Sequence, residues 1–394
     1  MGVTISGVGC SLIDYLYTNV DFDSDSFRRY SSVAVGDGGL SPGKLVFSDE
    51  FEKFSGVDFH RALRDCTGGK EPETLNLGGP AIVALINAAQ LLHDTDSRFN
   101  FYGAMADDES GHHIVQILKG LPVNTDNYRI LEGETPTTVV LSDPSYHEGS
   151  GERTFINTIG VAGSITPDDL GDHFFDAEIV LFGGTGLMPQ VHDGLTGLSR
   201  KAQANDCLTI VNTVFDFRSE KNAPDKRWPL GESDETYENI DLLIVDREEG
   251  MRMSGTATPG ASLRWFRDHG VDSAIVTCGA QNYHLYSGGR YFTELELQEL
   301  PVSKQIRADI DSGAVSPGDT TGCGDNFVGG VLASVAEQYE SGGSISLLEA
   351  ASWGVASGGQ ACLYIGGTYI EGHPGEKRAL IERYYEHYRR QVNP

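Results

Sequence analysis

The stretch GDTTGCGDNFVGGVL, which runs from Gly318 to Leu332, has the composition of a loop that opens into a helix. The first turn of a helix presents backbone N–H groups without an intrahelical acceptor, together with the positive end of the helix dipole. Glycines let a bulky anion approach those N–H groups because no Cβ stands in the way. The stretch therefore predicts a phosphate-binding helix start, with N–H groups from Gly322, Cys323 and Gly324.

Asp325 follows these residues inside the first turn of the predicted helix. A carboxylate at that position is suited to accept the proton of a hydroxyl group that attacks a phosphoryl group. The alternative is that Asp325 only complements the helix dipole, a common role that contributes about 0.3–1 kcal/mol. The stretch by itself does not decide between the two roles.

Short apolar runs rich in β-branched residues alternate with segments of helical period over most of the chain. Such runs are typical of parallel strands that are buried on both faces. The expected strands cover residues 3–10, 99–105, 177–184, 207–213, 240–246 and 273–279, and the expected helices cover 80–95, 110–120, 189–205, 260–270, 323–340 and 346–364. This alternation predicts an α/β fold with a doubly wound, mostly parallel sheet flanked by helices. Ligands of such sheets bind at the carboxyl ends of the strands.

Two regions interrupt this alternation. Residues 15–75 are rich in Gly, Ser, Asp and Phe, and residues 33–47 suggest a hairpin. Within residues 127–160, the runs TPTTVVLSD and ERTFINTIG alternate like strands with one face in water. We expect segments of both regions to form a small β-sheet lid on a single domain that spans residues 1–394. A disordered insertion at 15–75 is the alternative, and the helix expected at 377–391 is interpreted as a packing element.

The charge of the chain limits its partners. Its 57 acidic and 29 basic residues give a formal net charge of -28. Such a surface repels nucleic-acid backbones and anionic lipid surfaces, so neither nucleic acid nor a membrane is an expected partner. Adaptation to high salt and general solubility both explain the acidic excess, and the second needs fewer assumptions.

The six cysteines are scattered and form no C-x-x-C pair, which favours reduced thiols over a disulfide framework or a zinc site. The N-terminal segment lacks the basic region of a signal peptide, and no later run of about 18 apolar residues follows it. We therefore expect a soluble, cytoplasmic protein.

The run DTTGCGDNFVGGVL resembles the C-terminal signature of the ribokinase (PfkB) family of carbohydrate kinases, whose usual form is D-T-x-G-A-G-D. Cys323 stands where Ala is usual, an exchange of one small residue for another. A helix start can acidify a thiol, but the sequence shows no neighbouring His, and we interpret Cys323 as a packing residue. The resemblance implies a ribokinase-like fold with a lid, with Asp325 as the base beside an anion hole.

Two N-terminal segments extend the resemblance. SGVGCSLID is similar to the family's first strand and to the Asp that binds sugar hydroxyls, here Asp14. NLGGPAIVALINAA resembles the di-glycine signature, in which Gly78 and Gly79 let the substrate lie against the backbone. The family usually has an Asn four residues after the second glycine, where this chain has Val83, so one substrate hydrogen bond is in doubt.

Three further segments imply ligands for a nucleotide and its cations. VDREEG is similar to the family's N-x-x-E motif, which holds Mg²⁺ through water and here falls on Asp246 and Glu249. VTCGAQN resembles the element beneath the nucleotide phosphates, which implies that Thr277 and Gly279 bind ATP. In many members a monovalent cation such as K⁺ binds beside the anion hole. The two positions that match its ligands are Asp319 and Thr321.

The resemblance implies an ATP-dependent kinase that phosphorylates a primary hydroxyl of a small carbohydrate. Ribose, fructose, related keto-sugars, sugar acids and nucleosides remain open as acceptors. The alternatives are a catalytically silent regulatory protein that binds a nucleotide or a sugar, and a nicotinamide-dependent enzyme. GVGCSL lacks the third glycine of a dinucleotide fingerprint, which disfavours the last of these. A homodimer through the lid is possible for a chain of this family.

Overall fold

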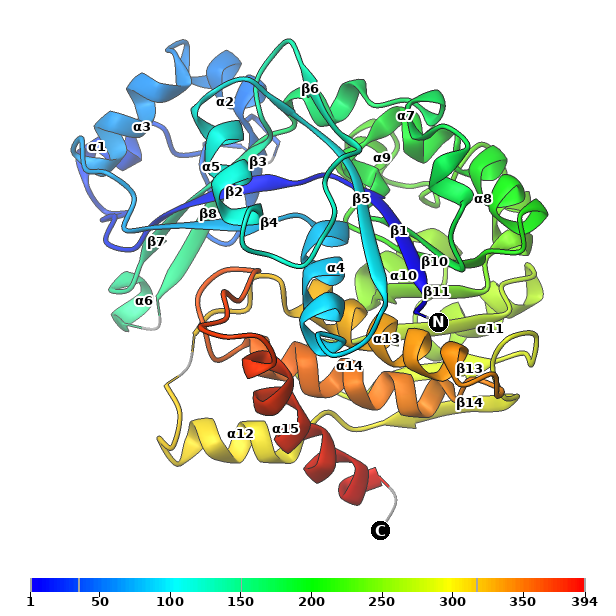
Figure 1. The fold of residues 1–394 in the computed structure, drawn as a ribbon. Helices are drawn as coiled ribbons and strands as arrows, with labels where there is room; N and C mark the ends of the chain where they lie inside the picture. Colours follow the sequence, from blue (N-terminus) through cyan, green and yellow to red (C-terminus); the bar gives the residue numbers. More distant parts are fainter. Residues whose placement is uncertain (1, 35, 150, 317, 393–394) are drawn as a thin grey trace.

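The computed structural model describes residues 2–34, 36–149, 151–316 and 318–392 (Figure 1). Within these residues, nine strands form one sheet. Strands β1, β5, β6, β9, β10, β11 and β12 run parallel, while β13 and β14 pair in antiparallel fashion. In sheet order they are β14 (Leu295–Leu300), β13 (Tyr283–Ser287), β12 (Ser273–Thr277), β11 (Leu242–Asp246), β10 (Leu208–Asn212), β9 (Ile179–Gly183), β1 (Thr4–Gly9), β5 (Arg98–Ala106) and β6 (Tyr128–Leu131). All six strands that the sequence predicts lie in this sheet, so the predicted α/β class is confirmed.

Both faces of the large sheet are covered by helices. Alternate strand residues point to opposite faces, so Leu242 belongs to one hydrophobic cluster and Leu243 to the other. Helices α4 (Pro80–Leu91), α13 (Cys323–Glu340), α14 (Leu347–Ala361) and α15 (Glu376–Val392) contribute to the first cluster. Helices α7 (Pro189–Asp193), α8 (Leu195–Ala204), α10 (Arg247–Ser254) and α11 (Pro259–Asp268) contribute to the second. Burial on both faces explains the uniformly apolar strand sequences.

A second, smaller sheet lies beside the first (Figure 1). In the described residues it has five strands, in the order β3 (Leu45–Phe47), β8 (Glu152–Thr158), β7 (Thr137–Asp143), β2 (Leu12–Tyr17) and β4 (Thr74–Gly78). The runs TPTTVVLSD and ERTFINTIG supply β7 and β8, as the sequence predicts. The sheet extends beyond the predicted segments, because β2 begins at Leu12 and β4 ends at Gly78.

The prediction of a hairpin at 33–47 is wrong. This outcome refers to the described residues of that segment, which do not include Val35. Only Leu45–Phe47 forms a strand there, and it pairs in parallel with β8. Most of the regular structure in residues 15–75 is helical, in α1 (Asp25–Arg28), α2 (Ser48–Ser55) and α3 (Phe59–Thr67). Their aromatic side chains Phe27, Phe51 and Phe59 pack with the small sheet in a third hydrophobic cluster. This burial explains why helices form in place of the predicted hairpin.

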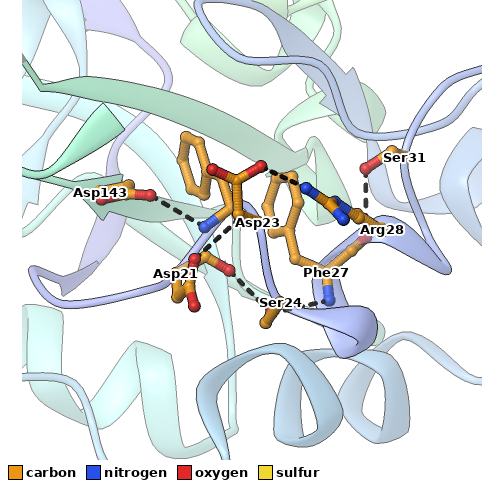
Figure 2. A network of polar contacts seen from close by, with 8 residues as sticks. Asp21, Asp23, Ser24, Phe27, Arg28, Ser31 and Asp143 are labelled. Carbon is orange, nitrogen blue, oxygen red and sulfur yellow. Dashed lines mark hydrogen bonds and ion pairs between the residues drawn. The ribbon is translucent and has the colours of Figure 1, made fainter. Parts of the chain in front are cut away.

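Residues 21–31 are held on the small sheet by polar contacts (Figure 2). The N–H of Phe22 donates to Asp143 on β7 at 2.9 Å, and Ser24 caps α1 by accepting from the N–H of Phe27 at 3.2 Å. Arg28 forms an ion pair with Asp23 at 2.7 Å. These contacts favour an ordered segment over the disordered insertion that the sequence left open.

The remaining helices connect the strands. They are α5 (Glu109–Leu118), α6 (Tyr146–Gly149), α9 (Phe217–Asn222) and α12 (Lys304–Asp311), with 3-10 helices at Gly160–Ser164, Pro167–Leu170, His173–Phe175, Thr185–Leu187 and Asp234–Asn239. The single helix expected at 189–205 is divided into α7 and α8 at Gly194. Among the described residues, no helix combines the length and apolar character needed to cross a membrane.

Candidate active site

The start of α13 is shaped to receive an anion. Gly322 has a φ of 71°, and a Cβ there would lie 2.5 Å from Cα of Gly367, so only glycine fits. The space around Cα of Gly324 is open. Within the described part of the chain, no acceptor contacts the N–H of Gly322 or of Gly324, and the N–H of Cys323 makes only a long contact of 3.4 Å with Thr320. These N–H groups are available to an anion.

Asp325 lies in the first turn of α13 and is half-buried. Burial raises the pKa of Asp325 to about 6, from a usual value near 4. The carboxylate is therefore ionised at neutral pH and is a stronger base than an exposed Asp. This arrangement suits proton transfer beside a bound phosphoryl group.

Asp14 comes from the small sheet. Its carboxyl group is buried on β2, and burial raises the pKa of Asp14 to about 7, against a hydrogen bond from Thr138. The charges of Asp319 and Asp325 raise this pKa further. The charges of Asp319 and Asp325 thus act on Asp14, and a shared role of the three carboxyl groups in one site stays a prediction.

The two glycines between β4 and α4 allow close backbone approaches. A Cβ at Gly78 would lie 2.6 Å from Oδ2 of Asp14. Gly79 has a φ of 116°, and its Cβ would lie 2.1 Å from the carbonyl oxygen of Cys10. Val83, which departs from the family pattern, is buried in the next turn, and a Cβ at Gly367 would lie 3.3 Å from its methyl group. An apolar residue therefore fits the packing at position 83.

Asp246 and Glu249 form a capping box at the start of α10. The N–H of Glu249 donates to Asp246 at 2.8 Å, the N–H of Asp246 donates to Glu249 at 3.1 Å, and the hydroxyl of Thr213 donates to Glu249 at 2.6 Å. Burial, followed by the charge of Asp246, raises the pKa of Glu249 to about 8, and the charge of Asp325 also raises it.

These carboxyl groups fit Mg²⁺, because a divalent cation would favour the ionised forms that burial and repulsion oppose. Among the described residues, no group of three or more His, Cys, Asp or Glu side chains is placed to hold a metal ion by itself. A magnesium ion held near Asp246 and Glu249 would therefore take most of its ligands from water and phosphate oxygens, as Mg²⁺ commonly does.

Thr277 and Gly279 lie at the carboxyl end of β12, two strands away from the strand β10 at the centre of the sheet. The Thr277 hydroxyl makes a long contact of 3.4 Å with the Val245 carbonyl, and Gly279 has a φ of 59° with open space beside its Cα. Cys278, which lies between these two residues in the chain, lines a hollow of about 460 Å³. It is lined by Arg247, Pro259, Cys278, Gln281, Asn282, His284 and Glu299. Open space that can admit a ligand thus lies beside Cys278 and Gly279.

Arg153 is a site residue that sequence reasoning missed. It comes from β8 of the small sheet and forms an ion pair with Asp319 at 3.5 Å. Its guanidinium also donates to the hydroxyls of Thr320 at 3.2 Å and Thr321 at 3.3 Å. Asp319 further accepts from the N–H of Thr321 at 2.9 Å. Arg153 therefore supplies a positive charge beside Asp319 and Thr321, the residues predicted to bind a monovalent cation. Binding of that cation stays a prediction. The signal in the sequence was a lone Arg within a lid strand.

Lys377 is the second residue that the sequence did not reveal. It lies on α15, is 1% exposed, and donates to Oδ1 of Asn326 at 2.7 Å. The side-chain N–H₂ of Asn326 donates to the carbonyls of Gly322 at 2.9 Å and Gly367 at 2.8 Å. The helix expected to be only a packing element thus supports the residue that holds the start of α13.

Burial lowers the pKa of Lys377 to about 7, whereas the charge of Glu371 opposes that shift. The ammonium group also lies 5.6 Å from the ring of Tyr364 and 5.8 Å from that of Tyr369, and both contacts favour the charged form. In the unfolded chain a lysine titrates near pH 10.4. Folding therefore releases a proton from Lys377 between about pH 7 and pH 10, and stability rises with pH over that window.

We expect the Lys377→Met variant to lose this rise. Between pH 7 and pH 9, Lys377 contributes an increase of about 2 kcal/mol to the free energy of unfolding, because each pH unit is worth up to about 1.4 kcal/mol. Urea unfolding at both pH values measures the change. Lys119→Met, at an exposed lysine, is the matched control and keeps the wild-type rise. Equal rises in wild type and Lys377→Met would contradict the assignment.

Cys323 differs from the expectation for a helix start. Its thiol lies 3.2 Å from the sulfur of Cys362. Hydrogen bonding to Cys362 and burial raise the pKa of Cys323 well above its usual range, so the helix start does not acidify this thiol.

Known proteins are similar to this chain in sequence and in fold. Residues 67–371 match the sequence model of the family described as "pfkB family carbohydrate kinase". The 2-dehydro-3-deoxygluconokinase of Thermoproteus tenax is 24% identical over 50% of this chain and 60% of its own length. The aminoimidazole riboside kinase of Salmonella typhimurium is 27% identical over 59% of this chain and 66% of its own length. The chain thus spans less than two thirds of these two curated relatives.

A solved structure of adenosine kinase from Schistosoma mansoni in complex with 2-fluoroadenosine has a TM-score of 0.67 and 18% identity, and the match covers 93% of this chain and 97% of that one. At this identity the likeness shows the fold, which is ribokinase-like. The family match covers well over half of the sequence and includes the di-glycine turn and the start of α13. The chain therefore belongs to the pfkB family of carbohydrate kinases.

Proposed function

We propose that this protein is an ATP-dependent kinase that transfers the γ-phosphoryl group to a primary hydroxyl of a small sugar, sugar acid or nucleoside. One observation carries the proposal. The start of α13 joins accessible backbone N–H groups to the carboxylate of Asp325, whose pKa is raised to about 6, and the charge of Asp325 acts on the buried Asp14. An anion hole, a base and an acceptor-binding group are the parts that phosphoryl transfer requires.

In this proposal Asp325 accepts the proton of the acceptor hydroxyl as its oxygen attacks the γ-phosphorus in line. The N–H groups of Gly322, Cys323 and Gly324 stabilise the charge on the transferred group, and Arg153 adds a positive charge from the small sheet. Asp14 and the Gly78–Gly79 backbone orient the acceptor, because a misplacement of about 1 Å can cost about 100-fold in rate.

ATP lies across the strand ends in this proposal, over Thr277 and Gly279. Asp246 and Glu249 would hold Mg²⁺ through water. When bound, the ion supplies positive charge that neutralises the β- and γ-phosphates. The small sheet acts as a lid that excludes water, which would otherwise compete with the acceptor. Binding of K⁺ at Asp319 and Thr321, pairing of two copies through the lid and a cytoplasmic location stay predictions.

The nature of the acceptor is proposed only as a class. The two curated relatives are named for a sugar acid and for a riboside, and the solved neighbour contains a nucleoside. A buried carboxyl group such as Asp14 recognises hydroxyl groups, which all three classes carry. This shared chemistry supports a polyhydroxylated acceptor without selecting one.

The test is a coupled assay of ADP release with Mg²⁺, over a panel of pentoses, hexoses, keto-sugars, sugar acids and nucleosides. We expect acceptor-dependent turnover with at least one class, and a phosphorylated product by mass spectrometry. A folded protein that binds ATP with magnesium but phosphorylates none of these classes would instead support the catalytically silent alternative. An acceptor-independent release of ADP would identify a nucleotide hydrolase and would likewise contradict the proposal.

A further inference from the structure

Two cysteines meet beside the proposed anion hole. Their sulfur atoms lie 3.2 Å apart, although Cys323 and Cys362 are 39 residues apart in the chain. Cys323 is the first residue of α13, and Cys362 follows the last residue of α14. Among the described residues, no other pair of cysteines has sulfur atoms in contact, and none of the six cysteines is in a disulfide.

Close packing of the two helices brings these thiols together. A Cβ at Gly358 of α14 would lie 2.8 Å from the carbonyl oxygen of Cys323, and one at Gly330 of α13 would lie 2.5 Å from the carbonyl of Trp353. Glycines at these points allow the backbones of the two helices to approach closely. Both thiols are partly exposed, whereas Cys10, Cys66 and Cys207 are buried. The pair is thus accessible to a small reagent in solution.

Both cysteines are attached to the backbone of the proposed site. The N–H of Cys323 is one of the three proposed anion-hole donors. The carbonyl of Cys362 accepts from the N–H of Gly318 at 2.8 Å, and the carbonyl of Tyr364 accepts from Asp319 at 3.1 Å. The loop that precedes the anion hole is therefore fastened to the segment that carries Cys362. A bond between the two sulfur atoms would therefore link the first residue of α13 directly to this segment.

We propose that Cys323 and Cys362 form a reversible disulfide that switches off phosphoryl transfer by displacing the start of α13. The proposal rests on the kinase function proposed above. A disulfide bond is about 2 Å long, so the two sulfur atoms must approach by about 1 Å. A displacement of that size at a reacting centre can lower the rate by about 100-fold. Reduction of the bond restores the original distance and the activity.

The oxidant is hydrogen peroxide. The thiolate of one cysteine attacks a peroxide oxygen, so an S–O bond forms, the O–O bond breaks and water leaves after protonation. The second thiol then attacks the resulting sulfenic acid. The S–S bond forms, the S–O bond breaks, and hydroxide takes up the thiol proton as a second water. Two thiols lose two electrons in total, and one peroxide is reduced to two waters. A dithiol reductant reverses the reaction by thiol–disulfide exchange.

The test treats the full chain with a small excess of hydrogen peroxide, and then measures both the Cys323–Cys362 cross-link by non-reducing peptide mass spectrometry and kcat in the ADP-release assay. We expect the cross-link, at least a tenfold lower kcat, and recovery of kcat with dithiothreitol. Absence of the cross-link overturns the proposal, and so does a cross-linked protein whose kcat is unchanged.

Two variants separate the disulfide from other oxidation. The Cys362 thiol contacts Cys323 and the Gly358 carbonyl at 3.6 Å, so Cys362→Ser should keep the reduced activity and lose the reversible inactivation. Cys278→Ser is the matched control, because Cys278 is also partly exposed but unpaired with another sulfur. Relative to its own reduced state, it should be inactivated like wild type. Reversible inactivation of Cys362→Ser would contradict the proposal.

A failure of the proposed kinase activity can be distinguished from a failure of the proposed disulfide switch. If no acceptor supports turnover, the cross-link and the affinity for magnesium adenylyl imidodiphosphate, measured by calorimetry, still test the switch. A cross-linked protein that binds this analogue at least threefold more weakly supports displacement of the anion hole. Equal affinity of the reduced and cross-linked proteins overturns it.

Discussion

Replacement of Asp325 by Asn will lower kcat by about 10²–10⁴-fold, the contribution typical of a positioned general base. The amide has nearly the shape of the carboxylate but cannot accept the acceptor proton at neutral pH. The fold and the binding of ATP should remain, because Asp325 makes few structural contacts and the anion hole is formed by backbone N–H groups. Steady-state kinetics and calorimetry with a non-hydrolysable ATP analogue measure the two effects. Asp311→Asn, at an exposed end of α12, is the control and retains wild-type kcat.

The same carboxylate determines an acidic limb in the pH profile. Because the pKa of Asp325 is raised to about 6, the base is ionised above this pH and is progressively protonated below it. We therefore expect kcat/KM, which reports the pKa values of the free enzyme, to fall as the pH decreases through about 6. The limb should be absent from the residual activity of Asp325→Asn. Turnover of this variant close to wild type, or an unchanged limb in it, would show that another group is the base.

Gly79→Ala is expected to destabilise the protein by at least about 3 kcal/mol. The φ of 116° at Gly79 is unfavourable for any residue with a Cβ, and the added carbon would lie 2.1 Å from the carbonyl oxygen of Cys10. Relief of this clash would separate β4 from the chain between β1 and β2, on which Asp14 depends. Urea unfolding at constant m-value measures the loss.

Gly197→Ala is the matched control for that prediction. Gly197 lies exposed in α8, where a Cβ would meet open space, so alanine should raise the free energy of unfolding by up to about 1 kcal/mol. If Gly79→Ala were as stable as wild type, the close approach between Gly79 and Cys10 would be wrong. The substrate-binding role proposed for the di-glycine turn would then lose its geometric basis.

Local patterns predict much of the fold and part of the site. The apolar strand runs identify the parallel sheet, because burial on both faces demands apolar side chains at consecutive positions. The spacing of glycines before Asp325 identifies the start of α13 at Cys323, because glycine conformations and free N–H groups are properties of a few adjacent residues. The capping box of Asp246 and Glu249 also depends only on a few adjacent residues, although we interpreted these two residues from the sequence only as a metal-binding motif.

Contacts between distant segments decided the rest. Residues 15–75 form helices because Phe27, Phe51 and Phe59 are buried against the small sheet. No local sequence pattern predicts this burial. Arg153 reaches Asp319 only after β8 and the loop before α13 are placed side by side. In the sequence, Lys377 is one polar residue of an amphipathic helix, and it is buried at Asn326 only because α15 packs against α14 and α4.

What the sequence by itself determined is therefore the layered α/β architecture, the di-glycine turn and the helix that begins at Cys323 with Asp325 in its first turn. Each depends on side-chain periodicity or on backbone conformations within one turn. Only the tertiary structure decided the charges and thiols that surround this site: Arg153, the Lys377–Asn326 contact, the raised pKa of Asp14 and the Cys323–Cys362 pair. Burial and proximity across a fold depend on how all elements pack, and neither quantity is encoded by the spacing of residues along the chain.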